Sequence, residues 1–275
     1  MDNRELRLKS VRLRKSLLKY IYHAGAGHTG GSLSCVDILN VLYNRVLHVD
    51  TGNFRTPGRD RYIQSKGHSV EALYVTLADR GFFPESDLET LCGYQSPYIG
   101  HPTKKVNGIE QNTGALGHGL SISVGEAIAA KLDKKNHRIF TLIGDGELPE
   151  GSNWEAFLTA AHYKLDNLFV ILDYNRQQIT GSTSDVLNTD SVREKLEAFG
   201  WRVREVDGHN LAELEEALGG GPLEAGKPSF FIAHTLKGKG VSYMEGTVKW
   251  HHGVPGPDQF EQAIMELNQE EANFK

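Results

Sequence analysis

Short apolar segments alternate with helix-length segments through the second half of the chain. Four apolar segments are rich in β-branched and aromatic residues and predict strands, at residues 138–143, 167–173, 202–206 and 229–234. Between them, apolar residues recur at helical spacing and predict helices at residues 150–163, 191–199 and 211–218. Strands that alternate with helices indicate βαβ units and a parallel sheet that is covered by helices on both faces.

The spacing of apolar residues over the first 80 positions predicts mostly helices, with clear helical segments at residues 34–47 and 68–80. The stretch LGGGPLEAGKP at residues 218–228 predicts a surface loop. We find no internal repeat, low-complexity tract or interdomain linker. The pattern therefore predicts an α/β fold, a doubly wound parallel sheet, in a single domain over residues 1–275.

Charge and composition exclude several classes of protein. The net charge of −5 and the pI near 6.2 give no reason to expect nucleic acid or a membrane surface as a partner. No apolar stretch approaches the roughly 20 residues of a membrane span, and the charged N-terminus does not resemble a signal peptide. Cys35 and Cys92 form no CxxC motif and predict no disulfide framework. We therefore expect a cytoplasmic protein.

The sequence GAGHTG at residues 25–30 has the letters of a dinucleotide-binding fingerprint, but its context argues against that function. It follows a helical pattern, whereas the fingerprint follows a strand. We expect these glycines to end a helix and to lead into a loop that presents His28.

Two polar side chains stand where predicted strands end. Asp145 lies between Gly144 and Gly146 at the end of one strand, and Asn175 follows the next strand, with 28 residues between Gly146 and Asn175. Parallel strands bring their carboxyl ends to the same edge of a sheet, where ligands bind. Carboxylate and amide oxygens suit Mg²⁺, which also binds phosphate oxygens. Either residue alone is typical of a turn, but together they favour a metal–diphosphate site.

Histidines follow glycines unusually often in this chain. Five of the twelve histidines do so, namely His28, His68, His101, His118 and His209. A single loop histidine is more often structural than catalytic, but several on glycine turns suggest side chains held at a cleft. Imidazole binds phosphate or moves protons near neutral pH.

The GDG motif, followed by 28 residues and an asparagine, resembles the thiamine diphosphate motif. Nearly the whole chain resembles the N-terminal third of transketolases, and the order and spacing of its landmarks match that family. The landmarks are AGAGHTGGSLS, QSKGHSVEALY, GHPTKK, NTGALGHGLSISVGEAIAAK, GDGELPEG, DYNRQQITG, TLKGKGVSYME and WHHG.

The resemblance implies a thiamine diphosphate cofactor and a bound Mg²⁺ or Ca²⁺. It implies that Asp145 and Asn175 are side-chain ligands of the metal and that Gln177 adds its backbone carbonyl. It also implies contacts with the diphosphate for Gly146, Asn175 and His68. The loop beside the aminopyrimidine of the cofactor would consist of Gly114, Ala115 and Leu116.

Further roles are implied for residues near the substrate. His28 and His101 match histidines that contact the hydroxyls of the donor sugar. His252 matches one that contacts both diphosphate and substrate, with His251 as the alternative in register. Glu150 matches a glutamate at the contact between the active sites of a dimer.

The chain departs from the family in two side chains. Tyr174 stands where many thiamine enzymes have the first asparagine of an NN pair, and His118 replaces a frequent glutamine. Neither change removes an expected metal ligand. His118 could add a proton-transfer group, but we favour a structural imidazole.

The length of the chain is its largest difference from full transketolases. Full transketolases carry a second domain, which binds the pyrimidine and supplies its activating glutamate, and a third, C-terminal domain. The resemblance therefore implies the first subunit of a split transketolase, which moves a two-carbon ketol unit from a ketose phosphate to an aldose phosphate. Its partner would be a C-terminal subunit with the pyrimidine-binding domain, in a two-plus-two heterotetramer.

Other functions stay open from the residues alone. The α subunit of a 2-oxoacid dehydrogenase also carries the GDG motif and asparagine, but the histidines of SKGH, GHP and WHHG favour a transketolase. Deoxyxylulose phosphate synthase shares several motifs but normally carries all three domains on one chain. A non-catalytic, cofactor-binding orphan half is the third alternative.

Overall fold

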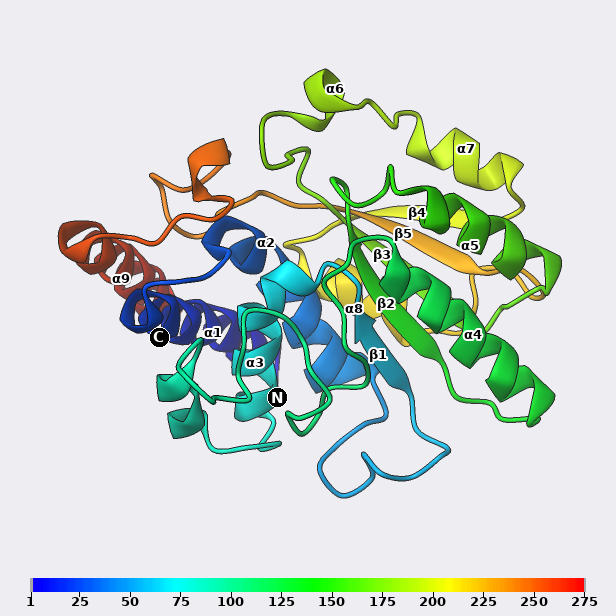
Figure 1. Ribbon diagram of the computed structural model, residues 1–275, viewed down its shortest axis with the longest axis horizontal. Coiled ribbons are helices and arrows are strands. Elements are labelled where there is room, and N and C mark those ends of the chain that lie inside the picture. Colours follow the sequence, from blue (N-terminus) through cyan, green and yellow to red (C-terminus); the bar gives the residue numbers. More distant parts are fainter. Residues whose placement is uncertain (1, 275) are drawn as a thin grey trace.

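A five-stranded parallel sheet forms the centre of the computed structural model, which describes residues 2–274 (Figure 1). The strands lie in the order β1-β2-β3-β5-β4, and each pairs in parallel with its neighbours. Their bounds are β1 Arg61–Gln64, β2 Ile139–Gly144, β3 Leu168–Tyr174, β4 Arg202–Asp207 and β5 Ser229–His234. The predicted fold class is therefore confirmed.

Helices cover both faces of this sheet (Figure 1). One face packs against α1 (Asn3–Ala24), α2 (Thr29–Val41), α3 (Val70–Asp79) and α8 (Leu211–Gly219). The other packs against α4 (His118–Leu132), α5 (Gly151–His162) and α7 (Val192–Ala198). The remaining helices and helical turns are η1 Leu42–Val46, η2 Gly67–Ser69, η3 Glu85–Thr90, α6 Thr183–Val186, η4 Val248–Trp250 and α9 Pro257–Asn273.

Alternation along β2 explains why two cores form. Phe140 and Leu142 join the core under α1, α2 and α3, whereas Ile139 and Ile143 join the core under α4 and α5. Successive side chains of a strand point to opposite faces of the sheet. A strand without charged side chains on either face is therefore buried on both, as is usual for parallel sheets.

The structure adds one strand to the predicted set. β1 is only four residues long and begins with Arg61, so it lacks the apolar run by which a strand is recognised in a sequence. The helix predicted at residues 34–47 begins earlier, at Thr29, and ends at Val41, where the π-helical turn η1 takes over. The loop predicted at residues 218–228 joins α8 to β5.

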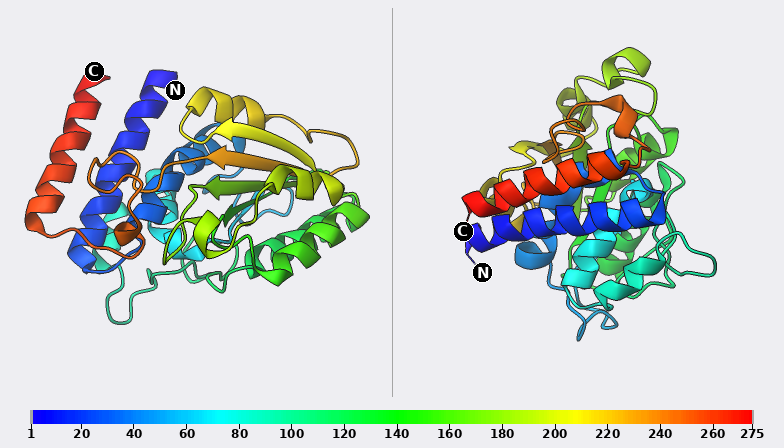
Figure 2. Two further views of the ribbon diagram at one scale, coloured as in Figure 1. Left: turned by 90° about the horizontal axis from the view of Figure 1, so that it is seen from above. Right: turned by 90° about the vertical axis from the view of Figure 1, so that its left-hand side faces the viewer.

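The helices α1 and α9 run side by side in opposite directions (Figure 2), which brings Arg4 near the start of α1 into hydrogen-bond contact with Phe274 after α9. Lys15 on α1 binds Glu271 on α9 at 2.5 Å. Both helices lie at the edge of the molecule, away from α4 and α5. Among residues 2–274, no helix combines the length and the apolar character that a membrane crossing requires.

Candidate active site

A cleft of about 360 Å³ opens at the carboxyl end of the sheet. The segments that follow β1, β2, β3 and β5 all contribute to its wall. This is the place where parallel α/β sheets bind ligands. The lining residues are His28, Gly31, Lys66, His68, Gly114, Leu116, Gly144, Asp145, Gly146, Glu147, Asn175, Gln177, Gln178, Ile179, Thr180, Lys237 and His251.

Asp145 is a buried carboxylate in the wall of this cleft, with 2 % of the residue exposed. One oxygen accepts the Gly146 amide at 2.8 Å, and the other accepts the Arg176 amide. In the same loop, Asn175 Oδ1 accepts the Gln177 amide at 3.1 Å. Burial, followed by the charge of Asp173, raises the pKa of Asp145 to about 7. A divalent cation in the cleft would favour the ionised carboxylate, because it supplies the missing positive charge.

Two lysines give the cleft a positive wall. Lys66 forms an ion pair with Asp173 and donates to the Gly31 carbonyl at 3.1 Å, just inside the start of α2. Lys237 lies buried, and burial, followed by the charge of Lys66, lowers its pKa to about 8. Two ammonium groups beside a helix N-terminus form surroundings that attract phosphate.

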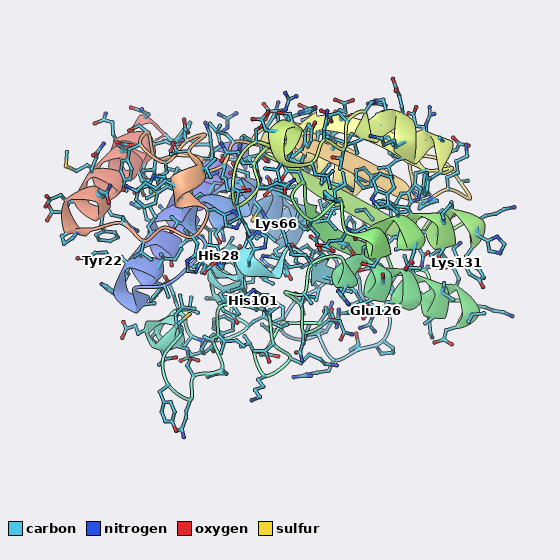
Figure 3. All side chains as sticks on the ribbon, turned by 45° about the horizontal axis from the view of Figure 1, so that its top comes forward. Tyr22, His28, Lys66, His101, Glu126 and Lys131 are labelled. Carbon is cyan, nitrogen blue, oxygen red and sulfur yellow. The ribbon has the colours of Figure 1, made fainter. Side chains whose placement is uncertain are left out.

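Five histidines form a cluster centred on His28, and three of them, His28, His68 and His251, line the cleft. Figure 3 shows His28 near His101 and Lys66 in the middle of the molecule. The centroid of the His28 ring lies 4.5 Å from that of His252, 5.3 Å from His68, 5.7 Å from His251 and 6.1 Å from His101. The loop predicted to present His28 does so: Gly25, in the left-handed conformation, ends α1, and His28 caps α2.

The surroundings of His28, His68, His101 and His251 favour their neutral forms. Burial, together with His252, His101 and the two lysines, lowers the pKa of His28 to about 4. Burial and then Lys237 lower that of His251 to about 3. Burial likewise lowers the pKa values of His68 and His101. A neutral imidazole keeps one donor and one acceptor, which suits the hydroxyl groups of a sugar.

Gly114 is required by its contact with His101. Its φ of +133° is a conformation that glycine adopts readily. A Cβ atom added there would lie 2.4 Å from the His101 Cδ2 atom. Leu116 also lines the cleft, whereas Ala115 between them does not. The structure thus places two of the three predicted loop residues in the cleft wall.

His251 and His252 occupy different positions. His251 lines the cleft, and its Nδ1 lies 2.9 Å from Lys237 Nζ. His252 is exposed, and its ring packs against that of His28 with centroids 4.5 Å apart. The alternative register, in which His251 faces the ligands, therefore agrees better with the geometry.

Glu150 and His118, like His101, are not among the residues that line the cleft. Glu150 is exposed and caps α5 from a non-helical conformation, close to the start of α4. His118, the first residue of α4, is also exposed, and its Nδ1 lies 3.1 Å from the Leu116 carbonyl.

Lys66, Lys237 and Glu147 are cleft residues that the sequence reasoning missed. Glu147 is 1 % exposed and accepts hydrogen bonds from Ser65 Oγ at 2.5 Å and from the Gly117 amide at 2.9 Å. Lys66 and Lys237 precede glycines, in SKGH and TLKGKG, so the search for histidines that follow glycines did not find them.

Comparison with known proteins assigns this site to a family. Residues 8–275 match the family described as "Transketolase, thiamine diphosphate binding domain". The chain belongs to the transketolase family. It is 47 % identical over 269 residues to one subunit of the apulose-4-phosphate transketolase of Phocaeicola vulgatus, covering 98 % of this chain and 96 % of that one. It is 40 % identical to the 6-deoxy-6-sulfo-D-fructose transketolase subunit SqwG of a Clostridium species, covering 94 % and 95 %.

Undivided transketolases are similar over only part of their length. The human enzyme is 39 % identical over 258 residues, which are 93 % of this chain and 41 % of that protein. The transketolase structure from Campylobacter jejuni superposes with a TM-score of 0.86 at 31 % identity, covering 100 % of this chain and 48 % of that one. These relatives confirm the prediction of a transketolase-type transferase, with the N-terminal part on a subunit of its own.

Proposed function

We propose that this chain is the N-terminal subunit of a two-chain transketolase that uses thiamine diphosphate and a divalent metal. It would transfer a two-carbon ketol unit from a ketose phosphate to an aldose phosphate. One observation carries the proposal: a single cleft joins a buried carboxylate with neighbouring amide oxygens, two lysines and a cluster of neutral histidines. The family match to a thiamine diphosphate binding domain agrees with this set of groups.

The metal would bind at the end of β2 and β3. We assign the side chains of Asp145 and Asn175 and the backbone carbonyl of Gln177 as ligands of Mg²⁺ or Ca²⁺. Asp145 fits this role because it is a buried carboxylate whose pKa is raised. Among residues 2–274, no group of three or more His, Cys, Asp or Glu side chains forms a complete metal site. A cation that shares its ligands with a diphosphate needs no such group.

The diphosphate would lie between this metal and the two lysines. Gly146 and Asn175 adjoin the metal position, and His68 lies across the cleft with Lys66 and Lys237. A Cβ atom at Gly146 would lie 3.1 Å from Gln178 Cγ, so a side chain there would crowd the wall of the cleft. The loop of Gly114, Ala115 and Leu116 would lie beside the aminopyrimidine.

The histidines would bind the donor sugar. When bound, thiamine diphosphate supplies the electron sink that a C–C cleavage beside a carbonyl requires. The neutral rings of His28 and His101 would hold the sugar hydroxyls and accept or return a proton at their free ring nitrogens. His251 would reach both the diphosphate and the sugar, since it lies between Lys237 and His28.

The partner would be a C-terminal subunit that carries the pyrimidine-binding domain. The relatives that are named as one subunit of a transketolase support the existence of such a partner. The segment after β3 exposes Ile179, which lines the cleft, and Val186 and Leu187 at the end of α6, with 67 %, 44 % and 57 % of each residue accessible. Exposed apolar residues that cluster mark interaction surfaces. We propose a two-plus-two heterotetramer, with Glu150 at the contact between its halves, in the cytoplasm as expected from the sequence.

The sugar would carry an anionic group far from its carbonyl. Relatives are named for apulose 4-phosphate and for 6-deoxy-6-sulfo-D-fructose, two different ketoses with an anionic end. We therefore propose that the donor is a ketose phosphate. The substrates to be assayed should also include branched and sulfonated ketoses.

The test mixes this chain with its candidate partner, thiamine diphosphate and Mg²⁺. Ketol transfer is then measured against the panel, with each chain alone as the control. We expect activity only in the mixture, because the pyrimidine-activating glutamate belongs to the partner. Robust transfer by this chain alone would refute the two-chain proposal. Cofactor binding by the mixture without transfer on any ketose would favour the orphan-half alternative.

A further inference from the structure

Glu71 is a buried carboxylate that points at the segment bearing His28. It belongs to the first turn of α3, and 2 % of the residue is exposed. One oxygen accepts the backbone amide of His28 at 3.2 Å, and the other accepts the hydroxyl of Ser32 at 2.7 Å. Both bonds cross from α3 to the start of α2, so Glu71 fixes the place where α2 begins.

The segment before His28 is fitted closely to this carboxylate. Gly27 has a φ of +154°, and a Cβ atom added there would lie 2.9 Å from Glu71 Oε1 and 2.8 Å from Ile21 Cγ1. His28 is the N-cap residue of α2, yet its own side chain makes no capping hydrogen bond. Glu71 therefore bonds the His28 amide from outside, which leaves the imidazole free to face the cleft.

Tyr74 makes the equivalent contact with the segment of His101. It lies three residues after Glu71 on α3 and is 1 % exposed. Its hydroxyl reaches the carbonyl of Ile99 at 3.0 Å and the carbonyl of His101 at 3.2 Å. Residues three apart lie on the same side of a helix. One side of α3 thus bonds the backbones of both histidines, and His68 lies in the helical turn that leads into the same helix.

We propose that Glu71 and Tyr74 are positioning residues, which hold the backbones of His28 and His101 so that the two rings lie with centroids 6.1 Å apart, where the donor sugar would bind. The inference rests on the proposed function, in which these two histidines contact the donor sugar. It extends that function to a pair of residues that touch neither cofactor nor sugar. A displacement of about 1 Å in a positioned group can cost a hundredfold in rate, so such supports affect turnover.

A neutral side chain that keeps an acceptor at residue 71 would preserve the bond to the His28 amide. Burial raises the pKa of Glu71 to about 7, and the groups that favour its charge are the Ser32 hydroxyl and the amides of Glu71 and His28. All three are hydrogen-bond donors, and two of them belong to the segment that Glu71 positions. Glutamine keeps an acceptor for the His28 amide and therefore separates positioning from charge.

The kinetic experiment uses the assembled two-chain enzyme. Tyr74→Phe removes one hydroxyl and keeps the ring. Glu71→Ala removes the acceptor of the His28 amide bond, whereas Glu71→Gln keeps an acceptor without the charge. Tyr98→Phe is the matched control, since its buried ring packs on Tyr74 and its hydroxyl binds Asp87 at 2.9 Å, away from the histidines. We expect Tyr74→Phe and Glu71→Ala to lower kcat/KM for the donor about tenfold, with cofactor affinity within about twofold of normal. Glu71→Gln should recover most of the loss, and Tyr98→Phe should lose little.

A second measurement is independent of activity. Imidazole ¹⁵N spectra of the histidine-labelled chain report the surroundings of each ring, assigned by single histidine variants. We expect the His101 signals to shift in Tyr74→Phe and the His28 signals in Glu71→Ala, while Tyr98→Phe leaves both in place. If the unaltered assembly transfers no ketol, the proposed function fails and the spectra still decide on positioning. Unshifted His28 and His101 signals in both variants would overturn the inference.

Discussion

The ammonium of Lys66 and the carboxylate of Asp173 form an ion pair directly beneath the cleft, with side-chain exposures of 1 % and 0 %. Burial is the largest single influence and by itself would lower the pKa of Lys66 and raise that of Asp173. The charge of the partner and the hydrogen bonds around the pair together outweigh burial, so the pKa of Lys66 is raised, the pKa of Asp173 is lowered, and both groups stay ionised. Asp173 also accepts bonds from Ser34 Oγ, at 2.6 Å, and from Thr235. The pair therefore joins α2, the ends of β3 and β5, and the loop after β1, and it fixes a cation in the cleft wall.

Removal of one partner of this pair should destabilise the fold strongly. Asp173→Ala leaves the Lys66 ammonium buried without its counter-charge, which costs about 3–5 kcal/mol in such pairs. Urea unfolding of the chain measures this loss. Glu216→Ala is the control, since its pair with Arg204 has side-chain exposures of 73 % and 35 %. We expect the control to cost less than about 1 kcal/mol. Equal losses in the two variants would contradict the buried pair.

Asp145→Ala should abolish metal-dependent binding of the cofactor. The substitution removes the one carboxylate of the proposed metal site, and we expect affinity for thiamine diphosphate in the presence of Mg²⁺ to fall at least ~100-fold. Isothermal titration of the assembled enzyme, with and without a chelator, measures the effect. Asp133→Ala, at the exposed end of α4, is the control. An Asp145→Ala enzyme that still binds the cofactor with its normal Mg²⁺ dependence would remove Asp145 from the metal site.

Strand ends and glycine turns made much of the cleft predictable from the sequence. Asp145 and Asn175 follow apolar runs, and parallel strands bring their ends together whatever the loop conformation. Most of the histidines were found because glycines precede them. β1 was missed because an edge strand of four residues with Arg61 and Gln64 at its ends has no apolar periodicity.

The residues that position the site could not be predicted from the sequence. Glu71 lies on α3 among apolar residues, and its bond to His28 joins positions 43 apart in the chain. Nothing local marks such a contact, because it depends on how α2 and α3 pack together. The choice between His251 and His252 also needed the structure, since the two are adjacent and only the turn after η4 decides which ring enters the cleft.

Cofactor affinity should fall as the pH rises above about 8. Lys237 has its pKa lowered to about 8, first by burial and then by Lys66. Below about pH 8, Lys237 carries the positive charge that attracts the diphosphate. Above about pH 8, Lys237 is deprotonated in the cofactor-free protein but stays protonated in the complex, so binding requires the uptake of a proton. Affinity should therefore fall by up to about tenfold per pH unit above 8. Isothermal titration between about pH 7 and 9.5 measures this slope.

The variant Lys237→Met tests whether Lys237 causes this dependence of cofactor affinity on pH. It should bind the cofactor more weakly at pH 7 and lose most of the pH dependence. Lys239→Met is the matched control, because Lys239 pairs with Glu245 at 3.5 Å and does not line the cleft. An unchanged slope in Lys237→Met would assign the pH dependence to another group.

His251→Ala should impair the enzyme far more than His252→Ala. His251 lines the cleft, bonds Lys237 and stacks on His68 with ring centroids 5.5 Å apart, so its loss should weaken both cofactor binding and turnover. His252 is exposed and contributes through its contact with His28, so its loss should mainly raise the KM for the donor sugar. We expect about a hundredfold loss of kcat/KM for His251→Ala and less than about tenfold for His252→Ala.

His118→Ala serves as the control for this pair, since it removes an exposed imidazole that lies outside the cleft. Cofactor affinity and kcat/KM should be measured for all three variants in the same assembly. Asparagine at residue 251 adds a finer test, because its amide can still accept the Lys237 bond that the His251 Nδ1 accepts. If that bond holds Lys237 toward the diphosphate, His251→Asn should recover cofactor affinity without recovering turnover. The opposite ranking, with His252→Ala the more damaging change, would return the functional role to His252.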